Sequence, residues 1–543
     1  MNEKALRFAL GALLVLGGAA IYAQTAGFSY LRLDDGQYTY MCPFVMGGLT
    51  WENVWTAFGR EFSWGGIWMP LTSVSYMAVV SAFGNAPGPQ HVAGAALHLV
   101  NAALFYWLLL RLLGRRGREG RGAAALAFGA AALWAWHPLR VESVAWVASR
   151  KDALFTLFTL AGLLAWERGR WCGGYLAMAL ACLCKPTAMC FPFLAFAVER
   201  LAEAGAECPT PRANWRGLVK YVPLLALAAA TGLLATYSQS HGLGGEIELY
   251  SGTLSWRLLN AAVSTGLHLF HLACPVGLTC FYRPIPEGLP LQAALGLSAL
   301  VAAAAGFAFA WWRARGARSV LFLTALWFAA SLGPTLGIAA SFGHQAYADR
   351  FTYVPMMAFS LLAVFLVPRR WTKAVALALC VAAGGYGVLA GQYAGTFRDD
   401  LAAFRRVAEC DPENAKAHQA IGAALLAREG SVDEAIDCFR RAIRLDPAGK
   451  AGIDLIYALH RRGRPEDREE SWRLTEPFRE DPSLDEDGLV LDLLATEAYK
   501  HGEVGEAKRF LKAMTKVRNW QFAERAKGFL RAIEEKEKGN ADK

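Results

Sequence analysis

Two adjacent carboxylates follow the first apolar stretch of the chain. Asp34 and Asp35 come a few residues after an apolar run over about residues 5–26. Carboxylates beside a membrane are costly unless they bind a cation or a proton, and one of them could accept a proton from an attacking hydroxyl group. The dipeptide Asp35-Gly36 is also typical of a solvated turn. If the pair is catalytic, the sequence favours Asp35 as the base, because Gly36 allows a substrate to approach the backbone closely.

Further ionisable side chains lie between or within later apolar stretches. One group lies in residues 137–152 and consists of His137, Arg140, Glu142, Arg150, Lys151 and Asp152. Lys185 interrupts the next apolar stretch, and Asp349 and Arg350, followed by Tyr353, begin a late one. Ionisable residues at such depths usually face a cavity or one another. The alternative is that the Arg and Lys side chains only anchor helices at the membrane interface.

Together these residues describe a polar cavity that contains both signs of charge. Cations at membrane depth suit the phosphate of a lipid, and a nearby carboxylate suits the removal of a proton from a hydroxyl group. The pattern therefore predicts transfer of a group from a phosphorylated lipid to an acceptor. The 11 cysteines form no CxxC pair and no Cys/His cluster with zinc spacing, so they predict no metal site. Whether a divalent cation is needed stays open.

Apolar stretches long enough to cross a bilayer fill the first two thirds of the 543-residue chain. A helix needs about 20 apolar residues to cross the hydrocarbon core. We expect helices near residues 5–26, 90–110, 123–138, 151–167, 171–184, 186–200, 218–238, 257–275, 290–312, 319–338, 350–368 and 372–396. The first stretch resembles a signal peptide, but the many spans that follow favour an uncleaved first helix.

Basic residues between the stretches predict the topology. They cluster at residues 111–121, 168–170, 313–318 and 369–373. Because Lys and Arg are retained in the cytoplasm, these loops and the N-terminus are expected there, with residues 27–89, 139–150, 239–256 and 339–349 outside. This placement also explains the formal net charge of +9 without a nucleic-acid partner.

One segment breaks the expected alternation of loops between the cytoplasm and the outside. Either residues 257–275 are re-entrant or lie at the outer surface, or residues 171–200 form one long helix. The second alternative would put residues 201–217 outside, although Arg216 and Lys220 flank that loop, so we favour the first. Both alternatives give about eleven spans and place the C-terminus outside the cytoplasm.

The composition changes at about residue 397 to Glu, Lys, Arg and Ala, with a period near 34 residues. In residues 415–447 the small and apolar positions match the tetratricopeptide signature. Ala435 allows two helices to approach closely, and Phe439 fills the space between them. Two weaker copies and a capping helix over residues 521–538 follow. Such an array either packs only on itself or presents a concave surface to a polypeptide.

The order of the motifs resembles a known family. The blocks LDDGQY, WMPLTSVSYM, HPLRVESVAWVASRKDAL, CKPT and YADRFTYVP precede the repeat tail. They resemble bacterial relatives of the transmembrane-and-tetratricopeptide-repeat O-mannosyltransferases, which belong to the GT-C class of lipid-dependent glycosyltransferases. The resemblance implies an active site at the outer face of a helix bundle and a polyprenyl-phosphate or polyprenyl-diphosphate sugar as donor. It also implies an acidic base at Asp34 or Asp35, with Arg150, Lys185 and Arg350 facing the donor phosphate.

The sequence as a whole predicts an all-α protein. A GT-C-like transmembrane domain is expected over residues 1–396, and a short extracytoplasmic tetratricopeptide-repeat solenoid over residues 397–543. The expected function is transfer of a hexose-like sugar, as in O-mannosylation, from a polyprenyl-phosphate-linked donor to a protein hydroxyl group. The rivals are a glycosyltransferase that acts on a lipid or a cell-wall glycan, and a non-enzymatic membrane-anchored scaffold. The residues expected to bind the substrates are His137, Arg140, Glu142, Arg150, Lys151, Asp152, Lys185, Asp349, Arg350 and Tyr353.

Overall fold

The chain forms two compact units, Met1–Ala403 and Phe404–Lys543. The computed structural model describes residues 2–59, 67–203, 215–241, 253–283, 290–338, 347–428, 431–447, 449–479, 488–517 and 520–541. Throughout these residues the secondary structure is helical, without a strand, so the expected all-α class is confirmed for them. Most of the predicted outer loops at 239–256 and 339–349 lies outside the described residues. The assignment of a glycosyltransferase-like domain and a repeat domain to the two units stays a prediction.

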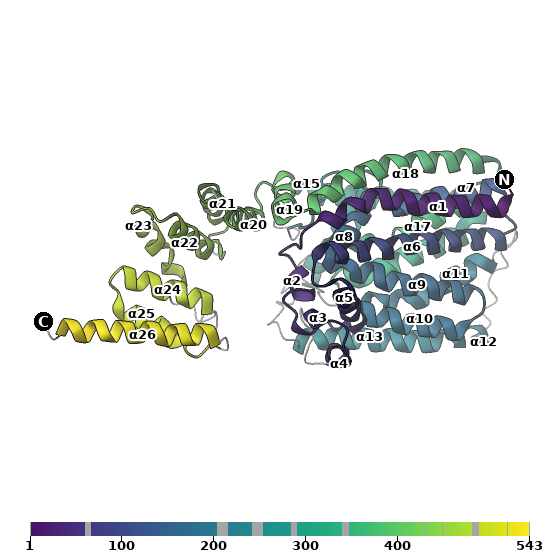
Figure 1. The fold of residues 1–543 in the computed structure, drawn as a ribbon. Coiled ribbons are helices and arrows are strands. Elements are labelled where there is room, and N and C mark those ends of the chain that lie inside the picture. Colours follow the sequence, from purple (N-terminus) through teal and green to yellow (C-terminus); the bar gives the residue numbers. More distant parts are fainter. Residues whose placement is uncertain are drawn as a thin grey trace. The chain divides into compact units, whose positions relative to one another are not determined.

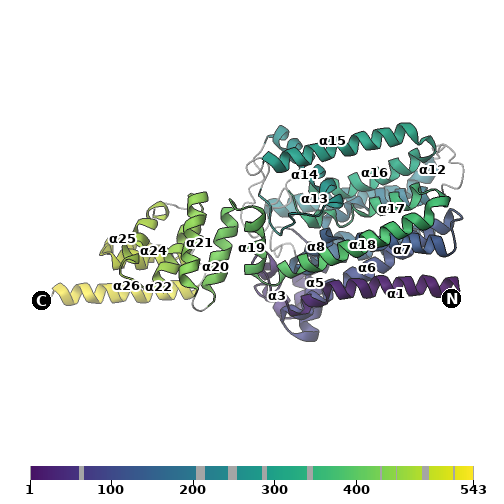
Figure 2. The same cartoon turned by 90° about the horizontal axis from the view of Figure 1, so that it is seen from above.

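The first unit consists mainly of long apolar helices that run side by side (Figures 1 and 2). They are α1 (Glu3–Tyr22), α6 (Pro87–Arg115), α7 (Arg121–Ala135), α9 (Arg150–Glu167), α10 (Trp171–Cys184), α11 (Phe191–Glu203), α13 (Val222–His241), α14 (Leu254–Ala273), α15 (Pro290–Arg313), α16 (Arg318–Leu332), α17 (Met357–Leu366) and α18 (Thr372–Ala394). Each one overlaps a stretch that the hydropathy pattern predicted.

In the described part of the chain, seven helical segments are long and apolar enough to cross a membrane. Three further apolar helices are shorter: Pro70–Phe83, Arg121–Ala135 and Trp171–Cys184. These segments suggest a multi-pass membrane protein. The expected total of about eleven spans and the side on which each loop lies stay predictions.

Shorter helices gather at one end of this bundle, the end opposite the N-terminus (Figures 1 and 2). They are α2 (Asp35–Tyr38), α3 (Pro43–Met46), α4 (Trp51–Phe58), α5 (Pro70–Phe83) and α8 (Val141–Ala145). The sequence placed all of residues 27–89 in a loop. It missed α5 because Thr72, Ser73, Ser75 and Ser81 interrupt the apolar residues of this 14-residue helix, so that no continuous apolar stretch is visible.

Polar contacts join the loops that were predicted to be cytoplasmic. The Glu3 carboxylate accepts a hydrogen bond from the backbone N–H of Gly120 at 3.0 Å. The Glu167 carboxylate accepts hydrogen bonds from Arg111 at 2.5 Å and Arg115 at 2.8 Å. The N-terminus, the basic loop after α6 and the end of α9 therefore share one end of the bundle.

A second set of contacts joins the loops that were predicted to lie outside. Asp35 accepts a hydrogen bond from the backbone N–H of Ala148 at 2.8 Å, and Glu142 forms an ion pair with Arg350. The segments that follow α1 and α7 thus meet the segment that precedes α17. The grouping of loops agrees with the predicted topology, although it does not say which end faces the cytoplasm.

The apolar stretch over residues 171–200 forms two helices. Lys185 has an extended backbone (φ −159°, ψ 131°) that ends α10, and the short helix η6 (Pro186–Cys190) leads into α11. Proline lacks the N–H that a continuing helix needs and restricts the residue before it. The alternative of one long helix over this stretch is therefore wrong.

The helix α14 packs across the beginning of α15. Gly266 lies so close to the backbone of Gly296 that no Cβ would fit between them. Near the end of α14, the Leu272 carbonyl accepts a hydrogen bond from His137 at 3.0 Å. The second contact places the end of α14 beside the segment that follows α7. The expectation that residues 257–275 are re-entrant or lie at the outer surface stays a prediction.

The second unit is built from consecutive helices joined by short connections. They are α20 (Ala415–Leu426), α21 (Val432–Leu445), α22 (Ala451–Arg462), α23 (Asp467–Leu474), α24 (Gly488–Lys500), α25 (Val504–Met514) and α26 (Trp520–Ala541). Ala435 and Phe439 are fully buried, and the Phe439 ring lies against Gly422 of the preceding helix. The identification of these helices as tetratricopeptide repeats stays a prediction.

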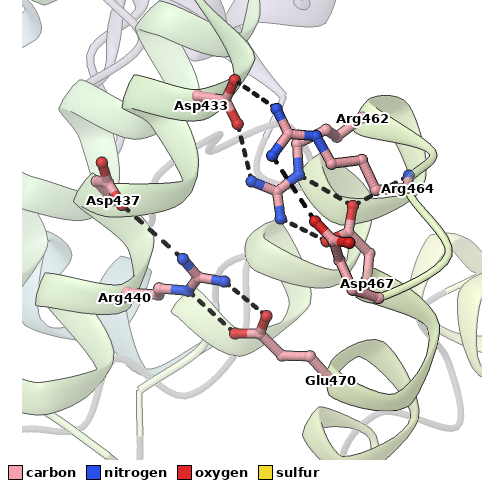
Figure 3. A network of polar contacts seen from close by, with 8 residues as sticks. Asp433, Asp437, Arg440, Arg462, Arg464, Asp467 and Glu470 are labelled. Carbon is pink, nitrogen blue, oxygen red and sulfur yellow. Dashed lines mark hydrogen bonds and ion pairs between the residues drawn. The ribbon is translucent and has the colours of Figure 1, made fainter.

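Ion pairs join successive helices of the second unit (Figure 3). Arg462 binds Asp433 at 2.8 Å and also pairs with Asp467. Arg440 donates to both carboxylate oxygens of Glu470, at 3.0 and 2.6 Å. A two-point contact of this kind fixes the orientation of both groups. Ion pairs as well as apolar packing therefore hold α21, α22 and α23 together.

Candidate functional site

The two adjacent carboxylates after α1 have different surroundings. Asp35 is fully buried. One of its carboxylate oxygens accepts the backbone N–H of Leu31 and the other accepts that of Ala148, both at 2.8 Å. Asp34 is the residue before α2 and is only partly buried. Asp35 therefore ties the first outer segment to the second, while the Asp34 carboxylate stays accessible.

Asp35 gives the protein a testable pH dependence. Burial raises the pKa of Asp35 to about 7, against the opposing effect of the Leu31 and Ala148 N–H groups. Because this pKa is above its unfolded-state value, the folded protein holds the proton more tightly than the unfolded chain does. The contribution of Asp35 to the free energy of unfolding is then complete below about pH 4 and is lost between about pH 4 and 7.

We expect this fall in the free energy of unfolding with rising pH to disappear in Asp35→Asn, because asparagine has no proton to exchange. At most, the wild-type slope should exceed that of the variant by about 1.4 kcal/mol per pH unit in this window. Thermal unfolding of both proteins in detergent between pH 4 and 8 measures the difference. Equal slopes in the two proteins would show that Asp35 titrates normally.

Glu142 and Arg350 form a buried ion pair. The Glu142 side chain is 1% exposed and the Arg350 side chain 14%. Besides the ion pair, Glu142 accepts the backbone N–H of Arg350 at 2.7 Å. The rings of Trp146 and Phe351 each lie 5.1 Å from the guanidinium carbon of Arg350. The predicted residues Glu142 and Arg350 thus come together from segments far apart in the sequence.

A second ion pair joins Lys185 to Asp152, whose side chains are 12% and 2% exposed. Lys185, Asp152, Arg350 and Tyr353 all line one small cavity. We call it the Lys185–Arg350 cavity. Its other walls combine apolar side chains, such as Phe155 and Val354, with hydroxyl side chains. Two cations that the sequence predicted to face a phosphate therefore open onto the same space.

Asp34 lies beside this group of cations. Its negative charge acts electrostatically on both Lys151 and Arg350, although Asp34 is not among the residues that line the cavity. The Lys151 ammonium group donates a hydrogen bond to the Tyr38 hydroxyl at 3.2 Å and lies over the Tyr38 ring at 4.4 Å. The accessible carboxylate and the cations of the cavity thus belong to one charged cluster.

Two of the predicted basic residues are buried and held by the protein itself. Arg150 donates to the backbone carbonyl of Gln90 at 2.6 Å and lies over the Tyr76 ring at 4.3 Å. Arg140 donates to the Thr352 hydroxyl. The Nε and Nη1 atoms of Arg140 are buried without a hydrogen-bond partner in the described part of the chain. Neither residue lines the Lys185–Arg350 cavity, so the structure does not bring Arg150 to the same space as Lys185.

Three other predicted residues are also largely buried. Asp349 accepts hydrogen bonds from the hydroxyl groups of Tyr282 at 2.9 Å and Tyr393 at 3.2 Å. The Tyr353 hydroxyl bonds to a ring nitrogen of His98 at 2.7 Å, and its ring also reaches the cavity. His137 donates through Nε2 to the Leu272 carbonyl, as described above. These contacts position the loops around the cavity.

Sequence reasoning missed Thr187, which lines the Lys185–Arg350 cavity. Its hydroxyl group is buried and has no hydrogen-bond partner among the residues that the structure describes. Ser331 and Thr335 line the same wall. A usable signal was present for Thr187, because it follows Lys185-Pro186 directly. No such signal exists for the other two, which occupy ordinary positions near the end of an apolar helix.

Metal-binding side chains do not cluster in the described ranges. There, no group of three or more His, Cys, Asp or Glu side chains is arranged to hold a metal ion. Asp152 and Glu142 are instead paired with Lys185 and Arg350. A role for a divalent cation is therefore left to experiment.

Besides the bundle and its charged cluster, the chain has a distant sequence similarity to one curated protein. The similarity is to Protein O-mannosyl-transferase F38B6.6 of Caenorhabditis elegans, which is 23% identical over 484 residues. The match covers 82% of this chain and 64% of that protein, so the chain spans less than two thirds of the length of this curated relative. No family model matches the chain. No solved structure matches it either.

Proposed function

We propose that this chain transfers a hexose-like sugar from a polyprenyl-phosphate-linked donor to a protein hydroxyl group on the outer face of the cytoplasmic membrane. The observation that carries the proposal is the Lys185–Arg350 cavity, where two cations meet apolar side chains such as Phe155. Arg and Lys suit a phosphate, and the apolar wall suits the first units of a prenyl chain. The distant similarity to a protein O-mannosyltransferase supports the same reaction class.

In this proposal Asp34 is the general base, in place of Asp35. A base needs a carboxylate oxygen within hydrogen-bond reach of the acceptor hydroxyl group. Both oxygens of Asp35 already accept backbone N–H groups, whereas Asp34 is partly exposed beside Lys151 and Arg350. Asp34 removes the hydroxyl proton as the oxygen attacks the sugar, and the cations stabilise the phosphate that leaves.

The proposal is tested with the purified full-length protein in lipid nanodiscs. A polyprenyl-phosphate mannose donor and a serine- or threonine-containing peptide are supplied, and the peptide mass is measured before and after incubation. An increase of one hexose supports the proposal. Intact-mass analysis of secreted proteins from cells with and without this chain identifies the natural acceptors. Modification only of a glycan or lipid would assign the enzyme to another acceptor class, and no transfer with any lipid-linked sugar would favour a scaffold.

We also propose that the second unit lies outside the cytoplasm and binds the protein acceptor or a partner. The basic residues Arg369, Arg370 and Lys373 precede the last long helix, which predicts that this helix leaves the cytoplasm. An alkaline phosphatase fused after residue 543 should therefore be active, and a fluorescent protein that folds only in the cytoplasm should be dark. The matched control is the same pair of reporters fused after residue 370. Cytoplasmic signal from the full-length fusion would contradict the topology and the proposed side of the active site.

A further inference from the structure

Two residues that line the Lys185–Arg350 cavity have a polar atom without a partner. The Asp152 side chain is 2% exposed and pairs with Lys185 through Oδ1. Its Oδ2 atom is buried and forms no hydrogen bond to any residue that the structure describes, and the same is true of the Thr187 hydroxyl oxygen. Both residues line the cavity. Because buried polar atoms are normally paired, these two atoms indicate a place for a polar group of a ligand.

The other hydroxyl groups around the cavity are already bonded within the protein. Ser331 and Thr335 each donate to a backbone carbonyl of the preceding turn at 2.7 Å. The Tyr353 hydroxyl bonds to a ring nitrogen of His98 at 2.7 Å. Among the hydroxyl side chains that line the cavity in the described part of the chain, Thr187 is therefore the one available to a ligand.

The free space in the cavity admits only a small group. It is about the size of one water molecule, and a single hydroxyl group has a similar size. A carboxylate oxygen only accepts hydrogen bonds, whereas a threonine hydroxyl can donate or accept. A phosphate oxygen is itself an acceptor, so it would be repelled by Oδ2 of Asp152. A hydroxyl group can donate to Asp152 and accept from Thr187 at the same time.

We propose that Asp152 and Thr187 bind a hydroxyl group of the donor sugar and so distinguish the sugar-bearing lipid from a lipid phosphate without a sugar. The inference rests on the proposed function and adds donor recognition to it. The sugar is bonded directly to the phosphate that Lys185 and Arg350 are proposed to bind, so its nearest hydroxyl group lies only a few bonds away. Thr187 follows Lys185 by two residues, and Asp152 is paired with Lys185, so both lie beside the phosphate position.

Equilibrium binding of three lipids tests the proposal without requiring transfer. The probes are short-chain polyprenyl phosphodiesters that carry mannose, glucose or a methyl group, and all three have the same charge. They are titrated calorimetrically against the full chain in nanodiscs. We expect the better hexose diester to bind about 10- to 150-fold more tightly than the methyl diester, from the hydrogen bond to the Asp152 carboxylate.

The ratio of the hexose affinity to the methyl affinity isolates the sugar contact, because the phosphate and the chain are common to both lipids. Thr187→Val should lower this ratio by about 2- to 10-fold, through the loss of one hydrogen bond between neutral groups. Thr187→Ala replaces it if the valine variant does not fold. Thr187→Ser keeps the hydroxyl group and should keep the ratio. The matched control is Thr159→Val on α9, where the buried hydroxyl donates to the Phe155 carbonyl at 2.9 Å, and it should also keep the ratio.

A double variant tests whether the two side chains bind the same hydroxyl group. Asp152→Asn should lower the ratio on its own. Adding Thr187→Val to Asp152→Asn should then lower it by less than Thr187→Val does in the wild-type protein, because residues that share one partner do not act independently. Fully independent effects would contradict a shared hydroxyl group.

An unchanged ratio in Thr187→Val would overturn the proposal, as would a wild-type protein that prefers neither hexose diester over the methyl diester. An equal loss of affinity for all three lipids would overturn it in favour of a contact between Thr187 and the phosphate. The proposed function fails separately: the hexose preference can hold in a protein that transfers no sugar to a peptide, and transfer can occur without the preference. Absence of binding by every lipid would contradict the proposed donor and this inference with it.

Discussion

Asp34→Asn should lower the turnover number of sugar transfer by about 100- to 10,000-fold, the usual effect of removing a general base. Asparagine keeps the size of the side chain and cannot accept the hydroxyl proton. The KM for the lipid donor should change little, because Asp34 acts on the acceptor. Initial rates of mannose transfer to a peptide, at several donor concentrations, separate the two parameters.

Asp35→Asn is the matched control, since it makes the same chemical change one residue away. Its main effect should be on stability, because the asparagine NH₂ group faces one of the two backbone N–H donors that now bind the carboxylate. An Asp34→Asn protein that transfers sugar at a near-normal rate would rule out Asp34 as the base. If both variants stayed active, neither carboxylate would be the base.

Arg350→Ala should lower the free energy of unfolding by about 3–5 kcal/mol, the usual cost of leaving one partner of a buried ion pair alone. The partner that remains is Glu142, whose side chain is 1% exposed. The same variant should also bind the donor about 10- to 150-fold less tightly, through the loss of one charge-assisted hydrogen bond worth roughly 1.5–3 kcal/mol. Thermal unfolding in detergent and the KM for the donor measure the two effects.

The double variant Arg350→Ala/Glu142→Gln separates these effects. Neutralising Glu142 should restore much of the lost stability, because no unpaired charge is then buried, but it should leave donor binding weak. Arg398→Ala is a surface control: the Arg398 side chain is 65% exposed in its pair with Asp399, and such pairs contribute little. If the double variant recovered normal donor binding, Arg350 would have only a structural role.

Hydropathy predicted the long helices because each must bury its backbone polar groups within itself in order to cross a bilayer. It failed where the apolar pattern is interrupted and where a contact is not local. Hydroxyl residues interrupt the apolar pattern of α5, and the close contact of Gly266 with Gly296 depends on two segments whose pairing no local pattern encodes. Lys185-Pro186 was a local signal, and it correctly separated α10 from α11.

The sequence predicted which residues belong to the site better than it predicted what each residue does there. Ionisable residues in apolar surroundings singled out Lys185, Arg350, Glu142 and Asp152, and the structure pairs them across long distances in sequence. The sequence favoured Asp35 over Asp34 as the base, and it could not foresee the N–H of Ala148, which only the folded chain brings to Asp35. Their catalytic roles remain predictions.

The two ion pairs at the Lys185–Arg350 cavity bear on which anions the protein can select. Each cation is already paired with a carboxylate of the protein, so a phosphate has to compete with that carboxylate for the cation. A soluble nucleotide sugar or free phosphate is dilute in bulk water and would seldom displace these carboxylates from the cations. A lipid-anchored donor is confined to the same two-dimensional sheet as the protein, and this confinement raises its local concentration. A modest affinity of the cavity for the donor would then be enough for binding. After transfer, Glu142 and Asp152 would pair again with the two cations, and this would speed the release of the lipid phosphate.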